Sequence, residues 1–251
     1  MFTTPMDTLA LTGLCVLLAS YVQNLSGFAF GLVFLGLISA WHLMPIAEAA
    51  NAVTLITLVQ VTYYFRGQSP QKAWVTMRPA LPTSFLGIAL GVWLLTWMSG
   101  NALNQLRAVL GVTIILSALL LVTSSAHAAR RSGTAAFALT GLASGLMGGL
   151  FSTAGPPLVY LMYRQALPGE VIRQCLLLSF ALGQGCRLVM VLAMGQFTPH
   201  AVLIAAIAAP IVMAVVSLHR RYPPKLSHLA INRLTALLLL LTGLSLLRSV
   251  L

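Results

Sequence analysis

Hydrophobic residues gather into eight long segments along this chain, and the stretches between them are short and more polar. Each segment is long enough for a membrane-spanning helix, which needs about 20 apolar residues. The alternating segments of about ten residues that mark a membrane β-barrel do not occur in the sequence. The pattern predicts an all-α polytopic membrane protein with apolar segments at about 8–41, 46–65, 79–98, 103–123, 134–163, 171–194, 199–218 and 229–248.

The segments 8–41 and 134–163 fit neither one crossing nor two. As one helix, the about 34 residues of the first would be about 51 Å long, whereas the hydrocarbon core is about 30 Å thick. A break in each segment resolves the conflict. The second break is expected between Gly148 and Pro157, because glycine weakens a helix and proline cannot continue one. The first is expected at a short polar stretch, Gln23, Asn24, Ser26 and Gly27.

Basic residues decide between two topologies. They cluster at 66–78, at 130–131 and at 220–225. With eight simple crossings, the third cluster falls on the opposite side from the first two, against the excess of Lys and Arg in cytoplasmic loops. If the two broken segments are re-entrant hairpins, all three clusters become cytoplasmic and the two halves of the chain are inverted relative to each other. Kinked full crossings remain the alternative.

The two halves of the chain also resemble each other. Each contains a long broken segment, a span with a central glutamine and two plain spans, at about 8–123 and about 134–248. Shifting one half onto the other aligns three pairs of identical residues, Ser20 with Ser144, Gly31 with Gly155 and Gln60 with Gln184. Duplicated halves with a site at their interface are typical of secondary transporters.

Composition supports a single transmembrane domain over residues 1–251. Hydrophobic residues make up 59% of the chain and charged residues 7%, and the mean hydropathy is +0.95. A soluble domain would carry about 25% charge. The net charge of +11 comes from 14 basic and 3 acidic residues. Because the basic residues lie in short loops, they indicate membrane topology and not a nucleic-acid partner.

The two breaks are the predicted substrate site. Non-helical backbone at membrane depth is tolerated only where it is buried in protein or lines a cavity. In transporters such breaks hold the substrate, and the N-termini of half-helices point at anionic groups. Ser and Thr at these positions could equally cap the half-helices. The candidate substrate-binding residues at the breaks are Gln23, Asn24, Ser26, Gly27, Gly149, Ser152, Thr153, Gly155 and Pro156.

Arg187 stands inside the apolar run 171–194. Arginine at the centre of a membrane helix costs about 2.5–3.5 kcal/mol on insertion scales, and such residues mostly face the protein interior or a water-filled cavity. Its planar guanidinium suits two-point contacts to oxyanions. It could also extend to the interface or bind a backbone carbonyl. Gln184 shares its helix face, and Gln60 is the matching amide in the first half, although amides at this depth often bond a neighbouring helix.

Glu48 and His42 are candidates for proton coupling, because acidic residues are scarce here and histidine titrates near neutral pH. Glu48 could instead only complement a helix dipole. The three cysteines, Cys15, Cys175 and Cys186, lie in apolar segments, where thiols are usually packing residues. Neither a metal site nor a cofactor motif is found, so none is expected.

The block GLASGLMGGLFSTAGPPLVYLMYRQALPGEVIR at 141–173 resembles the second-half signature of the sulfite exporter TauE/SafE family. The matching positions are Gly141, Gly145, Gly148, Gly149, Gly155, Pro156, Pro157, Leu167, Pro168 and Glu170. The first half, at 26–54, matches more loosely and lacks the family's glycine triplet. The resemblance implies a multi-pass transporter of the inner membrane. It also implies that the substrates are sulfur-containing anions such as sulfite, sulfonates or thiosulfate.

The leading hypothesis is a secondary transporter that moves small anions by alternating access, with export favoured by the resemblance and the breaks meeting near the midplane. Protons are a candidate coupling ion, and a homo-oligomer is a further expectation. A passive anion channel is the first alternative. A thiol-dependent enzyme within the membrane, using Cys175 and Cys186, is the second.

Overall fold

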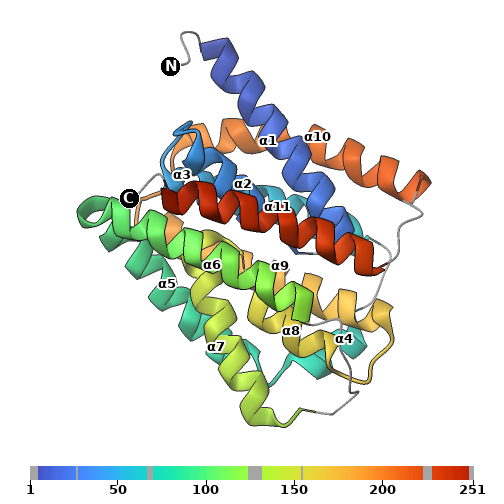
Figure 1. The fold of residues 1–251 in the computed structure, drawn as a ribbon. Helices are drawn as coiled ribbons and strands as arrows, with labels where there is room; N and C mark the ends of the chain where they lie inside the picture. Colours follow the sequence, from blue (N-terminus) through green and yellow to red (C-terminus); the bar gives the residue numbers. More distant parts are fainter. Residues whose placement is uncertain are drawn as a thin grey trace.

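The computed structural model describes residues 5–26, 28–66, 70–123, 132–153, 155–222 and 228–248, and helices dominate this part of the chain (Figure 1). The helices of the first half are α1 (Pro5–Ser26), α2 (Phe30–Ala40), α3 (Ile46–Phe65), α4 (Gln71–Met77), α5 (Leu81–Asn101) and α6 (Leu103–Thr123). Those of the second half are α7 (Thr134–Phe151), α8 (Pro156–Tyr163), α9 (Gly169–Ala193), α10 (Pro199–Arg221) and α11 (His228–Arg248). Every predicted apolar segment forms helix, and α4 is a short addition that hydrophobicity did not predict.

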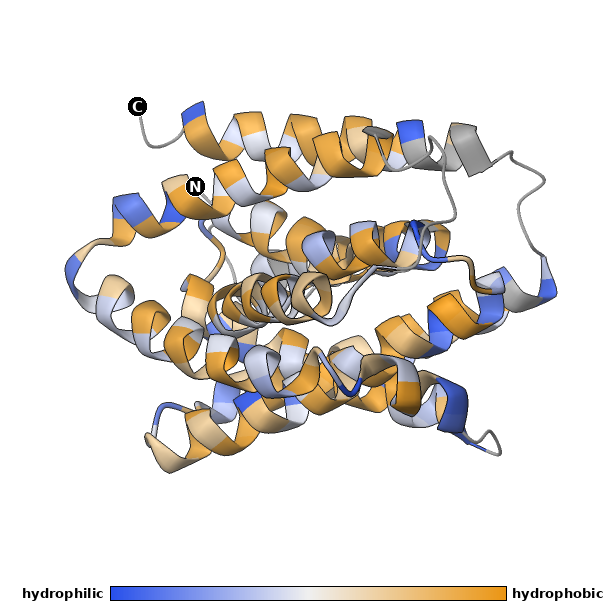
Figure 2. Cartoon of the chain, turned by 90° about the horizontal axis from the view of Figure 1, so that it is seen from below, coloured by the Kyte–Doolittle hydropathy of each residue, from blue (hydrophilic) through white to orange (hydrophobic). Residues whose placement is uncertain are grey.

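Seven helices within the described residues are long and apolar enough to cross a membrane, α1, α3, α5, α6, α7, α9 and α10. Apolar residues run along the helices, and hydrophilic residues collect mostly at their ends (Figure 2). Large apolar side chains also cover the outer surface. Leu139 on α7 and Val189 on α9 are 70% and 67% exposed. Such a surface would be unstable in water and is the one expected against lipid, which confirms the polytopic helical class.

Both long anomalous segments are broken, as predicted. The second break, at 152–155, lies within the predicted range. The first lies further along the chain than expected, because α1 continues to Ser26 and α2 begins at Phe30. Gln23 and Asn24 therefore belong to the last turns of α1. Polar side chains do not end a helix by themselves, and Asn24 donates to the Ser20 carbonyl one turn earlier, at 2.8 Å.

The second broken segment is a hairpin whose two ends meet. Ser132, just before α7, donates its backbone N–H to Gln165 Oε1 at 3.2 Å. Gln165, just after α8, donates in return to Ser132 Oγ at 2.8 Å. The segment therefore starts and ends on the same side of the molecule. This geometry supports the prediction of a re-entrant hairpin over a kinked crossing for 134–163.

Helices α3 and α9, which the predicted repeat pairs with each other, run antiparallel. Tyr64 near the end of α3 donates to Glu170 in the first turn of α9, at 2.6 Å. Asn51 near the start of α3 donates to the carbonyl of Gln196 just after α9, at 3.1 Å. Two halves in the same orientation would place these helices parallel, so the antiparallel pair supports the predicted inverted repeat.

Glycines on α5 and α7 bring these two helices into close contact. A Cβ on Gly145 would overlap the Ser84 carbonyl, and one on Gly149 would overlap the Ile88 carbonyl. Gly87 and Gly91 on α5 are equally crowded by the backbone of α7. Small residues at four-residue spacing allow this approach between membrane helices. Gly149, predicted to weaken a helix, lies within the last turn of α7 and serves this contact.

Gly145→Ala is expected to destabilise the protein by about 1–3 kcal/mol, because the new methyl group meets backbone that cannot rotate away. Gly185→Ala on α9 is the matched control, since a Cβ there meets nothing within 4 Å, and it should be neutral or slightly stabilising. Thermal unfolding in detergent measures both. Equal midpoints for the two variants would contradict the assigned helix contact.

Candidate functional site

The two helix breaks meet in the interior of the protein. A Cβ added to Gly31, at the start of α2, would lie 3.1 Å from Thr153 Cβ and 3.3 Å from the Ser152 carbonyl oxygen. Phe28 from the first break packs on Gly155 in the second. Because Gly31 has no side chain, the second break can pack directly beside the first. The prediction that the breaks of segments 1 and 5 meet is confirmed.

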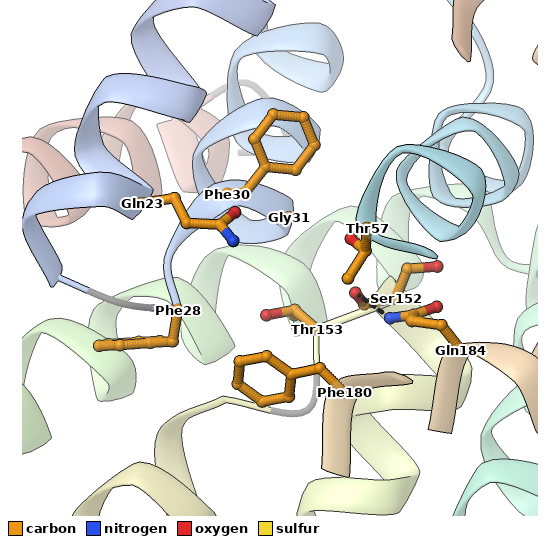
Figure 3. Close-up of a pocket in the computed structure, with 9 residues that line it drawn as sticks. All are labelled: Gln23, Phe28, Phe30, Gly31, Thr57, Ser152, Thr153, Phe180 and Gln184. Carbon is orange, nitrogen blue, oxygen red and sulfur yellow. Dashed lines mark hydrogen bonds between the residues drawn. The ribbon is translucent and has the colours of Figure 1, made fainter. Parts of the chain in front are cut away.

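A cavity lies where the breaks meet (Figure 3). Its water-accessible volume is about 10 Å³, close to what one water molecule needs. The lining residues are Gln23, Phe28, Phe30, Gly31, Thr57, Ser152, Thr153, Phe180 and Gln184. Figure 3 shows these residues arranged around one space, and they come from both halves of the chain. Hydroxyl and amide groups of this kind can bind a small anion, and three aromatic rings complete the lining.

Ser152 connects the second break to α3. Its backbone is in the left-handed region, with φ 52° and ψ 27°, directly after the end of α7. This conformation ends the helix, and it is uncommon for a residue with a side chain. Contacts to α3 hold it: Ser152 Oγ donates to the Ala50 carbonyl at 2.6 Å and lies 3.0 Å from Thr54 Oγ1.

Gln184 and Arg187 on α9 satisfy carbonyl groups at the end of α7. Gln184 Nε2 donates to the Ser152 carbonyl at 2.6 Å, and Arg187 Nε donates to the Gly149 carbonyl at 3.1 Å. The last four carbonyls of a helix lack partners within the helix, and a cation there is favourable because of the helix dipole. Two side chains one turn apart on α9 therefore cap the broken helix.

Arg187 is 1% exposed and bonds α3 as well as α7. One terminal nitrogen lies 2.7 Å from Thr54 Oγ1, 2.9 Å from Asn51 Oδ1 and 3.4 Å from the Ala50 carbonyl oxygen. The side chain does not extend to the interface. Nor is it among the residues lining the cavity. It reaches the cavity through Thr54 and Ser152, so direct contact between Arg187 and an anion stays a prediction.

The paired glutamines have different surroundings. Gln184 is buried and lines the cavity. Gln60 is half-buried and accepts a hydrogen bond from Gln23 Nε2 at 2.8 Å, which joins α1 to α3. Gln60 lies on a second, mostly apolar pocket between α3 and α10. Gln60 therefore does not line the cavity itself, but it holds the side chain of Gln23, which does.

The remaining candidate residues at the breaks differ in whether their side chains can reach the cavity. Gly155 precedes α8 and Pro156 is its first residue, while Gly149 offers only its carbonyl to Arg187. Asn24 is absent from the cavity lining, and its amide bonds its own helix. Gly27 and the side chain of Ser26 lie outside the described part of the structure.

The coupling candidates Glu48 and His42 are not among the residues that line the cavity. Glu48 Oε1 is 2.8 Å from His200 Nδ1 and accepts from Thr198 Oγ1 at 3.1 Å. The side chain of His200 is 56% exposed and that of Glu48 is 16% exposed. The structure therefore pairs Glu48 with His200, a histidine that was not among the sequence-predicted candidates.

Several residues of the site were missed from the sequence. Phe28, Phe30 and Phe180 resembled ordinary packing residues in apolar runs. Asn51, which accepts from Arg187, is the strongest omission. An asparagine in the stretch AEAANAVT is as unusual at membrane depth as a glutamine, and that signal could have identified it. Cys15 and Cys175 are buried and Cys186 is half-buried, all as free thiols.

Comparison with known proteins gives two matches and one negative result. The sequence profile described as "Sulfite exporter TauE/SafE" matches residues 12–246. The chain is 32% identical over 240 residues to a protein of Cupriavidus necator named "Probable sulfite/organosulfonate exporter TauE". That alignment covers 95% of this chain and 94% of the relative. No solved structure matches.

Thr54→Val is expected to lower the free energy of unfolding by about 1–3 kcal/mol, because it leaves a buried donor of Arg187 without its hydroxyl acceptor. Thr12→Val is the matched control. Thr12 is also buried, but among the described residues its hydroxyl bonds only the carbonyl one turn earlier. Denaturant unfolding in detergent compares the two, and a control that loses as much stability would contradict the assigned role of Thr54.

Proposed function

This chain belongs to the sulfite exporter TauE/SafE family, and we propose that it is a secondary transporter that exports small sulfur-containing anions by alternating access. Members of the family are transporters, so the chain is a multi-pass transporter of the bacterial inner membrane and not an enzyme. The alternative of a thiol-dependent enzyme is therefore dropped. The anions proposed are of the sulfite, sulfonate or thiosulfate type.

One observation carries the proposal of the site, namely that the two helix breaks line one small cavity whose lining side chains are buried. The hydroxyl groups of Thr57 and Thr153 and the amides of Gln23 and Gln184 supply polar contacts. The Ser152 hydroxyl already donates to the Ala50 carbonyl. Sulfite and sulfonate groups carry three oxygens around one sulfur, and several short donors converging from two sides suit that shape. Neutral donors also bind weakly enough for the anion to leave again.

The two half-helices contribute unequally to this proposed site. Phe30 and Gly31 begin α2 and line the cavity, and the first N–H groups of a helix have no intrahelical acceptor. The N-terminus of α2 is therefore suited to an anion. Helix α8 begins with Pro156 and Pro157, which lack the N–H, so its contribution comes from the dipole and from Thr153 in the preceding break.

A carrier is favoured over a passive channel by the size of the cavity. The space holds about one water molecule, so a multi-atom anion requires the surrounding helices to move apart. Because both breaks belong to one chain, the site is complete in a single copy, whether or not homo-oligomers form. A saturable flux would support the carrier, and single-channel currents would support the channel.

Thr153→Val should weaken binding of the anion about tenfold, because it removes one cavity hydroxyl while keeping the side-chain shape. The assay is thermal stability of purified protein with sulfite, thiosulfate, methanesulfonate, acetate and chloride. For the unchanged protein, an anion at 100 times its Kd should add about 2.7 kcal/mol. Thr12→Val is the control and should bind like the unchanged protein. A sulfur anion that binds Thr153→Val equally well would remove Thr153 from the site.

The proposal includes proton coupling through Glu48, with His200 as its neighbour in place of His42. Glu48→Gln should abolish the dependence of sulfite efflux on an imposed pH gradient in proteoliposomes while leaving anion-stabilised unfolding unchanged. Glu170→Gln, at the start of α9, is the matched control. If efflux from the Glu48→Gln variant still follows the pH gradient, Glu48 is not the coupling residue.

A further inference from the structure

Arg187 is a buried cation without a carboxylate partner among the described side chains. Its hydrogen bonds go to the carbonyls of Gly149 and Ala50, the amide of Asn51 and the hydroxyl of Thr54, all of them neutral. Its second terminal nitrogen is buried with no hydrogen-bond partner in the described part of the chain. Buried charges in proteins are usually paired, so this arrangement is unusual.

The acidic residues of the chain lie elsewhere. There are three of them. Glu48 bonds His200 and Thr198, and Glu170 bonds Tyr64. Asp7 is in the first turn of α1, about 29 Å along the helix axis from the end of α1 at the break. The C-terminal dipole of α7 offsets about half a unit charge at most, so the interior beside the breaks keeps a net positive charge.

This charge is coupled to the cavity by short hydrogen bonds. The Arg187 guanidinium is 2.7 Å from Thr54 Oγ1, which is 3.0 Å from Ser152 Oγ, and Ser152 lines the cavity. Gln184, one turn before Arg187 on α9, lines it too. None of the residues that line the cavity carries a charge. Arg187 is therefore the charge that a bound ion meets, in surroundings of low dielectric where screening is weak.

We propose that Arg187 selects the charge of the transported species, so that the site takes singly charged sulfur oxyanions in preference to doubly charged or zwitterionic ones. The inference rests on the proposed function and narrows its substrate class. Simple sulfonates and hydrogensulfite, the singly charged form of sulfite, fit it, whereas thiosulfate, a dianion at neutral pH, is disfavoured. A monoanion neutralises Arg187 at a distance. A dianion of the same shape leaves one surplus negative charge in the membrane interior, and a zwitterion brings its own cation into a positive site.

A series of sulfonates that share one head group tests the proposal on the unchanged protein. Isethionate carries a net charge of −1, sulfoacetate one of −2, and taurine is a zwitterion at neutral pH. Binding is measured by ligand-dependent thermal unfolding at constant ionic strength. Isethionate should bind at least about tenfold more tightly than sulfoacetate or taurine. Equal affinities, or tighter binding of sulfoacetate, would overturn charge selection while leaving sulfonate binding intact. If neither these three sulfonates nor sulfite binds, the proposed function is overturned as well.

Asn51→Asp provides the sharpest variant, because it places a carboxylate 2.9 Å from the guanidinium and neutralises Arg187 without removing it. Asn51→Ala is its matched control. Both variants lose the hydrogen bond from the Asn51 side-chain amide to the Gln196 carbonyl, but only Asn51→Asp changes the charge. Asn51→Asp should lose the preference for isethionate over taurine, whereas Asn51→Ala should retain it. An unchanged preference in Asn51→Asp would contradict the proposal.

Arg187→Lys and Arg187→Gln complete the test. Arg187→Lys retains the positive charge and should retain the order of affinities even where all of them fall. Arg187→Gln should abolish the order. The comparison uses the ratios of the ligand affinities within one variant. A variant that is merely less stable would therefore not show a changed ratio. If the order persists in Arg187→Gln, Arg187 has only its role in capping α7.

Discussion

The satisfaction of carbonyl groups where α7 stops is the constraint on which the rest of this structure depends. A helix that ends inside a membrane leaves backbone oxygens without water to bond them. Here α9 supplies the donors, Gln184 to the Ser152 carbonyl and Arg187 to the Gly149 carbonyl. The same arginine bonds Asn51 and Thr54 on α3. One buried side chain thus joins three helices from the two halves of the chain and stabilises the break.

The cavity follows from the same arrangement. Because Arg187 and Gln184 fix the end of α7, the peptide at Ser152 and Thr153 faces the start of α2, where Gly31 leaves room for it. The tight α5–α7 contact fixes the other face of α7. The lining itself is neutral, and the positive charge is held one layer behind it. Such a layout separates the groups that contact an anion from the charge that makes the cavity attractive to anions.

The sequence was sufficient to predict the long helices of this fold and the meeting of the two breaks, but not the other contacts between helices. Segment length together with Gly155, Pro156 and Pro157 predicted the second break, because bilayer thickness and proline chemistry act locally. The first break was placed too early, since Gln23 and Asn24 are polar but still helical. Gln184 and Arg187 were found because charges and amides are rare at membrane depth. Asn51 carries the same signal and was overlooked. The pairing of Glu48 with His200 depends on α3 meeting α10, and spacing along one helix does not encode that.

The most direct measurement is a structure of the protein with 2-bromoethanesulfonate, in which bromine marks the ligand by anomalous scattering. The account predicts sulfonate density between Thr153, Gln184 and the N-terminus of α2, with the bromine peak a few ångströms away near the phenylalanine rings. Helices α2 and α8 would be further apart than they are here. Bromine peaks found only outside this cavity, in protein that the ligand stabilises, would contradict the claim that the two breaks form the anion site.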